Sequence, residues 1–305
     1  MKDLLETIVE KNRKWTKYGN IATYIPGLAN SDADHLGVFI CDIRGEEYFA
    51  GDYDVKFTIQ SISKIVSFIC ALIDNDFQKL SKKISVEPTA DGFNSIVNLE
   101  TKNGHRPLNP MINAGAIATI SMVNGLTPKE KFNRVYDFMK KVTNNNHIYI
   151  NNNIYYSEKT TGDRNRALAY YMKSTGIIEE NIEEILNVYF KLCSIEITCK
   201  DIAYMGAVLA NDGILPMSGE RIITKEISKI VKAVMTTCGM YDSSGKFAVK
   251  VGLPAKSGVG GGIMAVVPKK MGIGVLGPAL DESGNSIAGI KVLEDLSKEL
   301  DLSIF

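Results

Sequence analysis

Ser61 and Lys64 carry the clearest chemical signal in this sequence, because a serine and a lysine stand three residues apart where an apolar segment begins. On a helix, residues three apart lie on one face, so the Ser61 hydroxyl and the Lys64 amine come within hydrogen-bonding reach. Apolar residues at helical spacing, Ile65, Phe68 and Leu72, share that face. Burial disfavours a charged amine, so we expect the pKa of Lys64 to fall until the neutral amine acts as a base. A serine activated in this way needs no histidine.

A second serine and lysine show the same spacing, in Ser243-Ser244-Gly245-Lys246. Chance alone supplies roughly one or two such pairs in a chain this long. This second pair lies in a glycine-containing turn signal without an apolar helix after it, so nothing would fix its geometry. Spacing alone therefore does not decide which pair is functional.

Residues 256–262 read KSGVGGG, which invites comparison with a phosphate-binding loop. Such a loop needs a glycine directly before its lysine and a helix after it, whereas this chain has Ala255 and then an alternating apolar pattern over 263–267. The strand-like context instead suits backbone N–H groups, that of Val259 among them, which would donate to an oxyanion. A glycine-rich turn between two strands, without a role in catalysis, accounts for the same segment.

Composition limits the partners that this protein can have. The chain has 305 residues, 45% of them hydrophobic, with 35 basic and 35 acidic side chains and a net charge of zero. This balance leaves no electrostatic footprint for nucleic acid or for an anionic membrane surface, and no apolar run approaches the ~20 residues that span a bilayer. The first residues carry acids early and lack the apolar core of a signal peptide, so we expect a cytoplasmic protein. Its ligand should be small and neutral or zwitterionic.

The cysteines and histidines favour neither metal nor thiol chemistry. The five cysteines are scattered through apolar segments without a C-x-x-C pair, which is typical of reduced structural thiols. The three histidines lie far apart and show no zinc-ligand spacing. No G-x-S-x-G elbow occurs either, so we expect no metal site and no Ser-His-Asp hydrolase.

Strand-like runs occur at both ends of the chain. They span residues 36–41, 47–50, 250–256, 263–267 and 271–276. The asparagine-rich stretch 144–154 is polar and turn-prone, and we interpret it as an exposed loop.

Helical spacing of apolar residues predicts helices over 1–11 and 286–300 and fills most of the middle of the chain. The simplest architecture is α+β: an antiparallel sheet of about five strands from both termini, with terminal helices packed on it and a mostly helical subdomain inserted. The predicted division places 1–56 and 241–305 in the sheet subdomain and 57–240 in the helical one, together one catalytic domain. A cleft between them is the natural place for a site.

The order of the two motifs, S-x-x-K early and K-[ST]-G late on a strand, is that of serine β-lactamases and penicillin-binding proteins. The two motifs together are less probable by chance than either alone. Against an enzyme that reacts with penicillins stand the lack of an export signal and of a convincing Ser-Asp-Asn element. That alternative stays open on these motifs.

Four blocks of the sequence resemble the β-lactamase-fold glutaminase family, and the likeness covers nearly the whole chain. They are QSISK at 60–64, EP at 87–88 with FNSI at 93–96, PLNPMINAGAI at 107–117, and KSGVGGG at 256–262. The resemblance implies a β-lactamase-like fold and an amidohydrolase that converts L-glutamine and water to L-glutamate and ammonia. It also implies a bacterial cytosolic homo-oligomer, a dimer or tetramer, that needs no cofactor.

Within this resemblance Ser61 attacks the γ-amide carbonyl while Lys64 takes its proton, and water then hydrolyses the γ-glutamyl enzyme. Tyr241 is the third implied catalytic residue, and we expect its hydroxyl to relay protons between Ser61 and the leaving ammonia. The implied substrate-binding residues are Tyr24, Ser61, Asn113, Glu158, Asn165, Tyr189, Tyr241 and Val259.

The chemistry of glutamine fits these residue types. A carboxylate such as Glu158 suits the α-ammonium, whereas amides and hydroxyls suit the α-carboxylate. The backbone N–H groups of Ser61 and Val259 suit the oxyanion. Asparagine is one methylene shorter, so its amide should fall short of Ser61 when its α-groups are clamped.

Some of these residues also have purely structural explanations. Asn113 lies among small residues that allow close helix packing, and Asn165 lies in the first turn of a helix that Asp163 would cap. Tyr189 belongs to an apolar helical repeat, so its default role is core packing with its hydroxyl at a rim. A catalytically silent amino-acid-binding protein on the same fold is the third hypothesis, although the intact serine–lysine pair argues against silence.

Overall fold

A five-stranded antiparallel sheet joins the two ends of the chain in the computed structural model, which describes residues 1–101 and 103–305. Its strand order is β2-β1-β8-β7-β6. The strands are β1 (Gly37–Asp42), β2 (Glu47–Gly51), β6 (Ala255–Ser257), β7 (Gly262–Val267) and β8 (Met271–Leu276). The two ends meet where β1 pairs with β8, with Gly37 opposite Leu276 and Asp42 opposite Met271. The predicted sheet of about five strands from both termini is confirmed.

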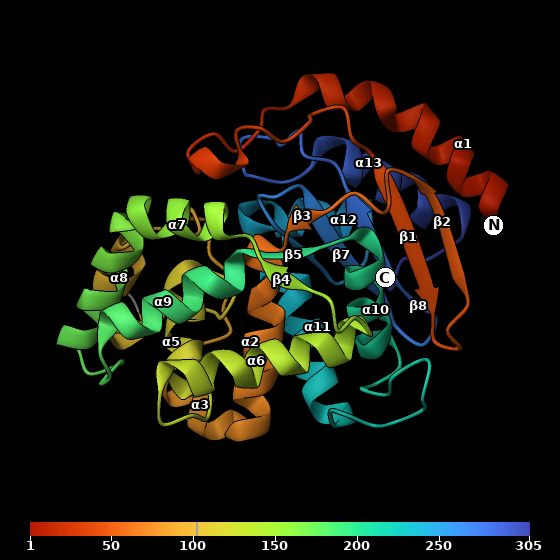
Figure 1. The fold of residues 1–305 in the computed structure, drawn as a ribbon. Coiled ribbons are helices and arrows are strands. Elements are labelled where there is room, and N and C mark those ends of the chain that lie inside the picture. The colour runs from red at the N-terminus through yellow and green to blue at the C-terminus, as the bar shows by residue number, and fades with distance from the viewer. Residues whose placement is uncertain (102) are drawn as a thin grey trace.

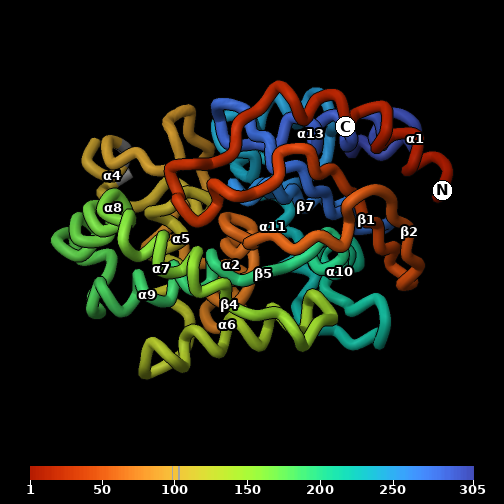
Figure 2. Tube along the Cα trace, turned by 45° about the horizontal axis from the view of Figure 1, so that its top comes forward, coloured from red at the N-terminus to blue at the C-terminus, as the bar shows by residue number. Residues whose placement is uncertain are grey.

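The two terminal helices cover one face of this sheet. They are α1 (Lys2–Arg13) and α13 (Ile287–Glu299), which lie against each other over the sheet (Figures 1 and 2). Side chains alternate across a strand, so Val38 and Ile40 of β1 join the apolar core beneath these helices while Phe39 joins the core on the other face. Both predicted terminal helices are therefore present.

Helix α10 (Cys199–Ala210) covers the opposite face and lies directly on β8. A Cβ added at Gly272 would stand 2.1 Å from the Ala203 oxygen, and one at Gly274 would stand 2.1 Å from the Cys199 oxygen. Only glycine permits this approach, because any side chain would push the helix off the strand. The close packing fixes α10 between the sheet and the remaining helices.

The middle of the chain is mostly helical, as expected, and its helices gather on one side of the sheet (Figure 1). They are α2 (Ser63–Asp74), α3 (Phe77–Lys83), α4 (Val97–Thr101), α5 (Asn113–Met122), α6 (Pro128–Thr143), α7 (Asn152–Thr161), α8 (Asp163–Ser174), α9 (Ile182–Cys193) and α11 (Lys225–Cys238). A small antiparallel sheet among them was not predicted. It has the order β3-β5-β4, with β3 (Phe57–Thr58), β5 (Ile195–Ile197) and β4 (Tyr149–Ile150). Helix α2 is buried along its length, from Ser63 to Leu72.

The strand predicted over 250–256 is wrong in its first part. Helix α12 (Ser244–Lys250) extends to the start of this stretch, and β6 begins only at Ala255. Between them Gly252 has a φ of +73°, and Pro254 has no N–H to donate to a neighbouring strand. These two residues make the connection a turn rather than a strand.

The loop predicted over 144–154 is also wrong in part, because β4 and the start of α7 occupy its second half. Two of its asparagines act as helix caps. Asn144 ends α6 in the left-handed conformation with a φ of +52°, and the Asn151 side chain accepts a hydrogen bond from Ile154 N at the start of α7. Asparagine is common both in loops and at helix caps, because its side chain forms hydrogen bonds with nearby backbone groups. Composition alone therefore did not distinguish a loop from a pair of helix ends.

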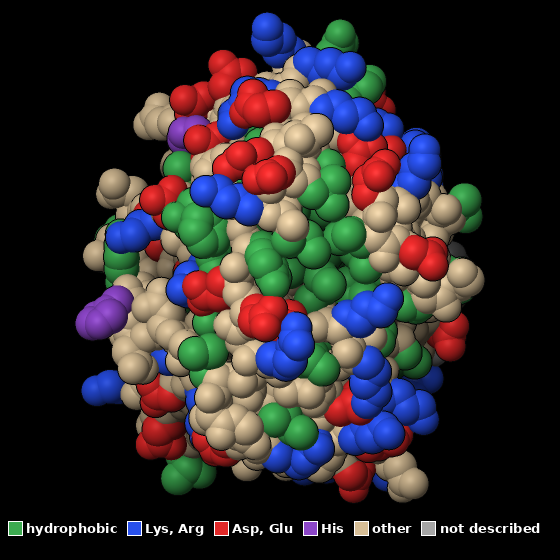
Figure 3. Space-filling view, turned by 90° about the vertical axis from the view of Figure 1, so that its right-hand side faces the viewer, with side chains coloured by type: hydrophobic (Ala, Val, Ile, Leu, Met, Phe, Trp, Pro, Cys, Tyr) green, Lys and Arg blue, Asp and Glu red, His purple; other side chains and the backbone are tan. Residues whose placement is uncertain are grey.

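Apolar side chains also gather at the surface. Figure 3 shows the side of the molecule at the right of Figure 1, where β2 forms the edge of the sheet. Green side chains fill the middle of this view, with charged side chains around them. Phe49 of β2 is 38% exposed, and its ring stacks on that of Phe39 in the neighbouring strand.

Candidate active site

Ser61 lies in a short 3₁₀ helix, Gln60–Ile62, that connects β3 to α2. The residue before it, Gln60, has a φ of +46°, in the left-handed region that favours glycine. Such a conformation costs on the order of 1–3 kcal/mol and persists where the surrounding structure imposes it. The serine therefore stands in a strained turn at the entry to an apolar helix.

Lys64 lies in the first turn of α2 and is 1% exposed. Its Nζ donates hydrogen bonds to Asn113 Oδ1 at 2.7 Å and to the Met111 carbonyl oxygen at 3.2 Å. Burial lowers the pKa of Lys64 to about 8. The fall in pKa expected from the apolar face of the helix is confirmed, and about one-tenth of this amine is neutral at pH 7.

Tyr241 begins a 3₁₀ turn, Tyr241–Ser243, and has a φ of +55°. Its hydroxyl donates to the Ser257 carbonyl oxygen at 3.2 Å. Burial raises the pKa of this phenol, while a hydrogen-bonding contact with Ser61 lowers it. Tyr241 therefore contacts Ser61, and the proton relay expected of its hydroxyl stays a prediction.

Glu158 projects from α7 and is 8% exposed. Burial raises the pKa of this carboxyl to about 7, and a hydrogen bond with Gln60 and the charge of Lys64 oppose that rise. The Gln60 amide also donates to Thr58 Oγ1 at 3.3 Å, which holds it in place. A cationic ligand group beside Glu158 would keep the carboxylate charged.

A cavity of about 120 Å³ opens beside Ser61. A water needs on the order of 10–15 Å³ of such space, so this cavity accommodates a small molecule. Seven of the predicted site residues line it: Tyr24, Ser61, Asn113, Glu158, Asn165, Tyr189 and Val259. Lys64 and Tyr241 do not line it: Lys64 donates to Asn113, which does, and Tyr241 donates to the Ser257 carbonyl oxygen, two residues before Val259.

The two asparagines are linked, since Asn113 Nδ2 donates to Asn165 Oδ1 at 2.9 Å. Asn113 begins α5 and is 9% exposed, whereas Asn165 lies in the first turn of α8 and is partly exposed. The expectation that Asp163 caps this helix is wrong, because α8 begins at Asp163 itself and Gly162 occupies the cap position. Both asparagines line the cavity.

The glycine-rich run after β6 packs tightly against the turn that carries Ser61. A Cβ at Gly260 would stand 2.4 Å from the Thr58 oxygen, and one at Gly258 would stand 2.8 Å from the Ile59 oxygen. This contact sets Val259 at the cavity wall next to Ser61. The glycines are thus required by close backbone approach, which the sequence pattern alone did not establish.

Sequence reasoning assigned no role to seven further residues that line the cavity, among them Gln60, Phe93, Asn94 and Arg164. Arg164 Nε donates to the Asn94 oxygen at 2.9 Å, and the rings of Phe93 and Tyr241 lie 5.0 Å apart. Gln60, Phe93 and Asn94 lie within the sequence blocks that resemble the family, so their position in these motifs was the signal that could have identified them.

The thiols are inert by environment. All five cysteines are free and buried. Burial, together with the charge of Glu158, raises the pKa of Cys193 to about 12. A thiolate is therefore disfavoured there, in agreement with the structural role expected for the cysteines.

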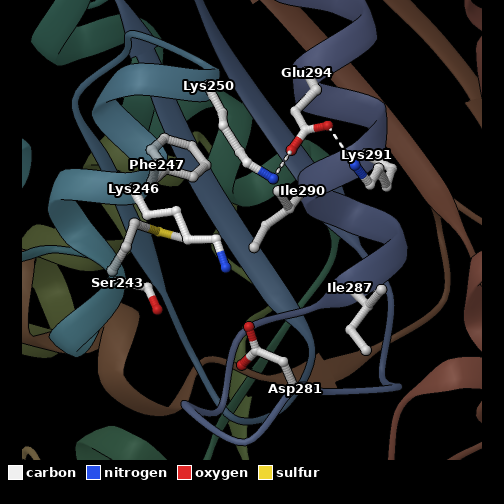
Figure 4. A pocket seen from close by; sticks show the side chains of 10 residues that line it. Ser243, Lys246, Phe247, Lys250, Asp281, Ile287, Ile290, Lys291 and Glu294 are labelled. Atoms are coloured by element: carbon white, nitrogen blue, oxygen red, sulfur yellow. Dashed lines mark hydrogen bonds and ion pairs between the residues drawn. The ribbon is translucent and has the colours of Figure 1, made fainter.

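The second serine–lysine pair lies elsewhere, at a separate cavity of about 140 Å³ between α12 and α13 (Figure 4). The predicted turn is wrong, because Lys246 belongs to α12, but its side chain is exposed. The Ser243 hydroxyl donates to the Ser283 hydroxyl at 3.2 Å. On the far wall Glu294 pairs with Lys250 and Lys291. This pair therefore lacks the burial that distinguishes Lys64.

Within 1–101 and 103–305, no three His, Cys, Asp or Glu side chains are grouped so that they could hold a metal ion. Over the same residues, no helix has the length and apolar character required to cross a membrane.

Sequence comparison gives the relatives of this chain. The profile of the glutaminase family matches residues 19–305. A glutaminase of Clostridium tetani (strain Massachusetts / E88) is 61% identical over 305 residues, which are 100% of both chains. A glutaminase of Clostridium botulinum (strain Kyoto / Type A2) has the same identity and coverage.

Solved structures agree with the sequence relatives. A probable glutaminase from Bacillus subtilis, complexed with 6-diazo-5-oxo-L-norleucine, has a TM-score of 0.91 and 42% identity over 99% of this chain and 95% of that one. A Bacillus subtilis glutaminase in covalent complex with 5-oxo-L-norleucine has a TM-score of 0.91 and 41% identity over 100% and 99%. Because sequence and structure agree over the whole length, the chain belongs to the glutaminase family.

Proposed function

We propose that this glutaminase converts L-glutamine and water to L-glutamate and ammonia through a γ-glutamyl ester on Ser61. The observation that carries the proposal is that Ser61 lines a small polar cavity, while the buried Lys64, three residues later, donates a hydrogen bond to Asn113 of the same cavity. Among the described residues that line the cavity, Glu158 is the one carboxylate. The proposed nucleophile and the proposed ammonium-binding group thus line one space of small-molecule size, and the proposed base is bonded to Asn113 in its wall.

In the first step, neutral Lys64 takes the proton of the Ser61 hydroxyl while Oγ forms a bond to the γ-carbonyl carbon of glutamine. The carbonyl electrons move to oxygen, and the backbone N–H groups of Ser61 and Val259 stabilise that oxyanion. When the carbonyl reforms, the carbon–nitrogen bond breaks and the nitrogen takes a proton from the Lys64 ammonium through the Tyr241 hydroxyl. Ammonia leaves, and an ester remains on Ser61.

In the second step, water attacks the ester and gives its proton to neutral Lys64. The carbon–oxygen bond to Ser61 then breaks, and Ser61 Oγ regains that proton as glutamate leaves. No cofactor takes part in either step. The role of Tyr241 is supported by its two contacts, with Ser61 and with the Ser257 carbonyl oxygen.

We assign the α-ammonium of the substrate to Glu158 and its α-carboxylate to the amides and hydroxyls of Asn113, Asn165, Tyr24 and Tyr189. The covalent complex of the Bacillus relative contains 5-oxo-L-norleucine, an α-amino acid with a carbonyl at the position of the glutamine amide. That chemistry supports a pocket that clamps the α-groups and presents a γ-carbonyl to a nucleophile.

Ammonia release from L-glutamine, measured for the wild type and for Ser61→Ala, tests this proposal. We expect Ser61→Ala to lose at least about 10³-fold in kcat, because the covalent route is removed. The matched control is Ser243→Ala, which removes the serine of the second pair and should leave kcat unchanged. Equal release by Ser61→Ala and the wild type would contradict the proposal.

Two further substrates separate the alternatives. L-Asparagine should release ammonia far more slowly than L-glutamine, because its amide does not reach Ser61. A chromogenic lactam tests the penicillin-interacting enzyme, and we expect no turnover of it. Binding of glutamine without ammonia release would instead indicate the silent binding protein.

We also propose that the protein is cytoplasmic and forms a homo-oligomer, a dimer or a tetramer. Five free, buried cysteines are compatible with a reducing compartment. The apolar side chains on the face of Figure 3 supply a surface that a second copy could cover. Light scattering coupled to size-exclusion chromatography measures the mass directly, and a monomeric mass near 33.5 kDa would refute the oligomer.

We keep the division into a sheet subdomain, 1–56 with 241–305, and a helical subdomain, 57–240, as a proposal. Its support is the core beneath the terminal helices, whose buried residues come only from 5–50 and 240–302. Limited proteolysis tests it, since the first cuts should fall near the two boundaries.

A further inference from the structure

The cavity of about 140 Å³ between α12 and α13 takes no part in the reaction proposed above (Figure 4). A water needs on the order of 10–15 Å³ of such space, so there is room for roughly ten waters. An apolar amino acid such as leucine has about as many non-hydrogen atoms. Four apolar side chains form part of the cavity wall: Met240, Phe247, Ile287 and Ile290. The cavity therefore has the size and the apolar surface for a small amphipathic molecule.

Five charged side chains line the same cavity, and only three of them pair with one another. Glu294 forms ion pairs with Lys250 at 3.5 Å and with Lys291 at 2.6 Å. Lys246 and Asp281 form no ion pair with any of the described residues, although both line the cavity. The fold thus places one positive and one negative charge without ionic partners in a single small space.

Lys246 and Asp281 reach this cavity from two different segments. Lys246 belongs to α12, whereas Asp281 lies between β8 and α13, where its Oδ1 accepts a hydrogen bond from Asn285 N at 2.9 Å. In Figure 4 the Lys246 amine and the Asp281 carboxylate point toward each other. Opposite charges that face each other without pairing are bridged well by a ligand that carries both charges on neighbouring atoms.

We propose that this cavity is a second ligand site, which binds a small α-amino acid with an apolar side chain. The α-carboxylate of the ligand pairs with Lys246 and its α-ammonium with Asp281. Its side chain packs on Phe247 and Ile290. A fatty acid would leave Asp281 without an ionic partner, and an alkylamine would leave Lys246 without one. This cavity and the one beside Ser61 share no lining residue among those described, so the two sites are separate.

Two of the lining residues act on Tyr241. Met240 precedes it in the chain, and burial and the charge of Asp281 raise the pKa of the Tyr241 phenol. A bound ammonium offsets that charge and makes the phenol a better proton donor. We therefore expect the ligand to raise kcat by about 2- to 3-fold at saturating L-glutamine and to leave KM nearly unchanged. This consequence, unlike the site itself, rests on the relay role proposed for Tyr241.

A ligand-observed NMR titration with L-leucine as the probe, in saturating L-glutamate, tests the site. We expect a Kd on the order of 1 mM. 4-Methylpentanoate lacks the ammonium and 3-methylbutylamine lacks the carboxylate, so each should bind at least about 10-fold more weakly. L-Alanine should also bind at least about 10-fold more weakly, because its side chain leaves the apolar wall uncovered.

Two variants assign the contacts to the ligand. Asp281→Asn removes the charge and keeps an oxygen that accepts from Asn285 N, so it should weaken L-leucine at least about 10-fold and leave 4-methylpentanoate unchanged. Lys246→Met should weaken L-leucine to a similar extent and leave 3-methylbutylamine unchanged. Glu282→Gln and Lys298→Met are the matched controls, because both residues are exposed and neither lines the cavity. Both controls should bind L-leucine as the wild type does.

The proposal is overturned if L-leucine does not bind, if L-glutamate displaces it, or if its affinity survives both Asp281→Asn and Lys246→Met. The coupling to Tyr241 is tested by kcat for ammonia release, with and without saturating L-leucine, in the wild type and in Tyr241→Phe. The rise should occur in the wild type and be absent in Tyr241→Phe. An unchanged kcat of the leucine-bound wild type would refute the coupling alone. Because the titration requires no turnover, its failure is distinguishable from a failure of the proposed function.

Discussion

Lys64 and Asn113 join the proposed base to the substrate pocket through one hydrogen bond, 2.7 Å from Nζ to Oδ1. An amide oxygen that accepts from the ammonium stabilises the charged form, whereas burial disfavours it. The amide nitrogen of the same Asn113 donates to Asn165 at the cavity wall. A ligand that contacts these asparagines would therefore also act on the proton of Lys64.

Asn113→Leu should lower the pKa of Lys64 further, because it removes the acceptor and keeps a similar volume. A hydrogen bond to a charged group contributes about 1.5–3 kcal/mol, so the shift is on the order of one unit or more. The midpoint at which kcat/KM rises with pH should move down accordingly. Asn165→Leu is the control, since it removes a cavity amide but leaves the Lys64 acceptor in place. Equal midpoints in the two variants would contradict this prediction.

The pH profile of the wild type should show two deprotonations. Glu158 must lose its proton to bind an ammonium, with a pKa of about 7, and Lys64 must lose its proton to act as a base, with a pKa of about 8. Log kcat/KM should therefore rise with a slope of about two well below pH 7 and level off above pH 8. The two groups interact, so the midpoints belong to the pair.

Glu158→Gln isolates the lysine in that profile. The slope should fall to about one, with a midpoint near the Lys64 value, and KM for L-glutamine should rise at least about tenfold as the ammonium loses its partner. Steady-state ammonia release between pH 5.5 and 9.5 measures both quantities. A profile in Glu158→Gln that keeps two deprotonations would assign the lower step to another group.

Much of the fold was predictable from apolar spacing. The strands β7 and β8 and the helices α1 and α13 carry long, regular patterns, and the structure places them within a few residues of the prediction. The small sheet of β3, β4 and β5 was missed because its strands have only two or three residues. Patterns that short carry no period, and tertiary contacts decide their conformation.

The site was predictable only in part, and the reason differs from residue to residue. The burial of Lys64 followed from its position on an apolar face of α2. The placement of Val259 depends on the neighbouring glycines, which let two backbone segments approach closely. The strained conformation of Gln60 depends on the turn between β3 and α2. Neither feature produces a periodic pattern of apolar residues in the sequence. Lys256 was visible as part of a motif, but the groups that its amine contacts come from distant segments that only the fold brings together.

The buried carboxyl of Glu158 should also make stability depend on pH. Burial raises its pKa from 4.5 to about 7 in the folded protein. Between these values the folded state binds more protons than the unfolded state, so stability falls as pH rises through this window. The loss should be on the order of 2–3 kcal/mol.

Urea unfolding of the wild type and Glu158→Gln at pH 5 and pH 7.5 measures that loss. The free energy of unfolding of the wild type should fall relative to the variant between the two pH values. Carboxyls with lowered pKa values, such as Asp212 and Asp52, act in the opposite direction but equally in both proteins. If the free energy of unfolding changed equally with pH in the wild type and in Glu158→Gln, the pKa of Glu158 would not differ between the folded and the unfolded protein.

Gly239 and Gly245 offer a last test of how the backbone supports Tyr241. A Cβ at Gly239 would stand 1.7 Å from the Ala255 oxygen, whereas one at Gly245 in α12 would meet no atom within 4 Å. Gly239→Ala should therefore force the end of α11 away from β6, at about 1–3 kcal/mol or more of stability. It should also lower kcat, because the shift displaces Tyr241.

Gly245→Ala should stabilise the helix by about 0.4–1 kcal/mol and leave kcat unchanged. Thermal unfolding with kinetics on both variants decides the matter, and a Gly239→Ala enzyme of wild-type stability and rate would show that the contact between α11 and β6 does not hold the tyrosine.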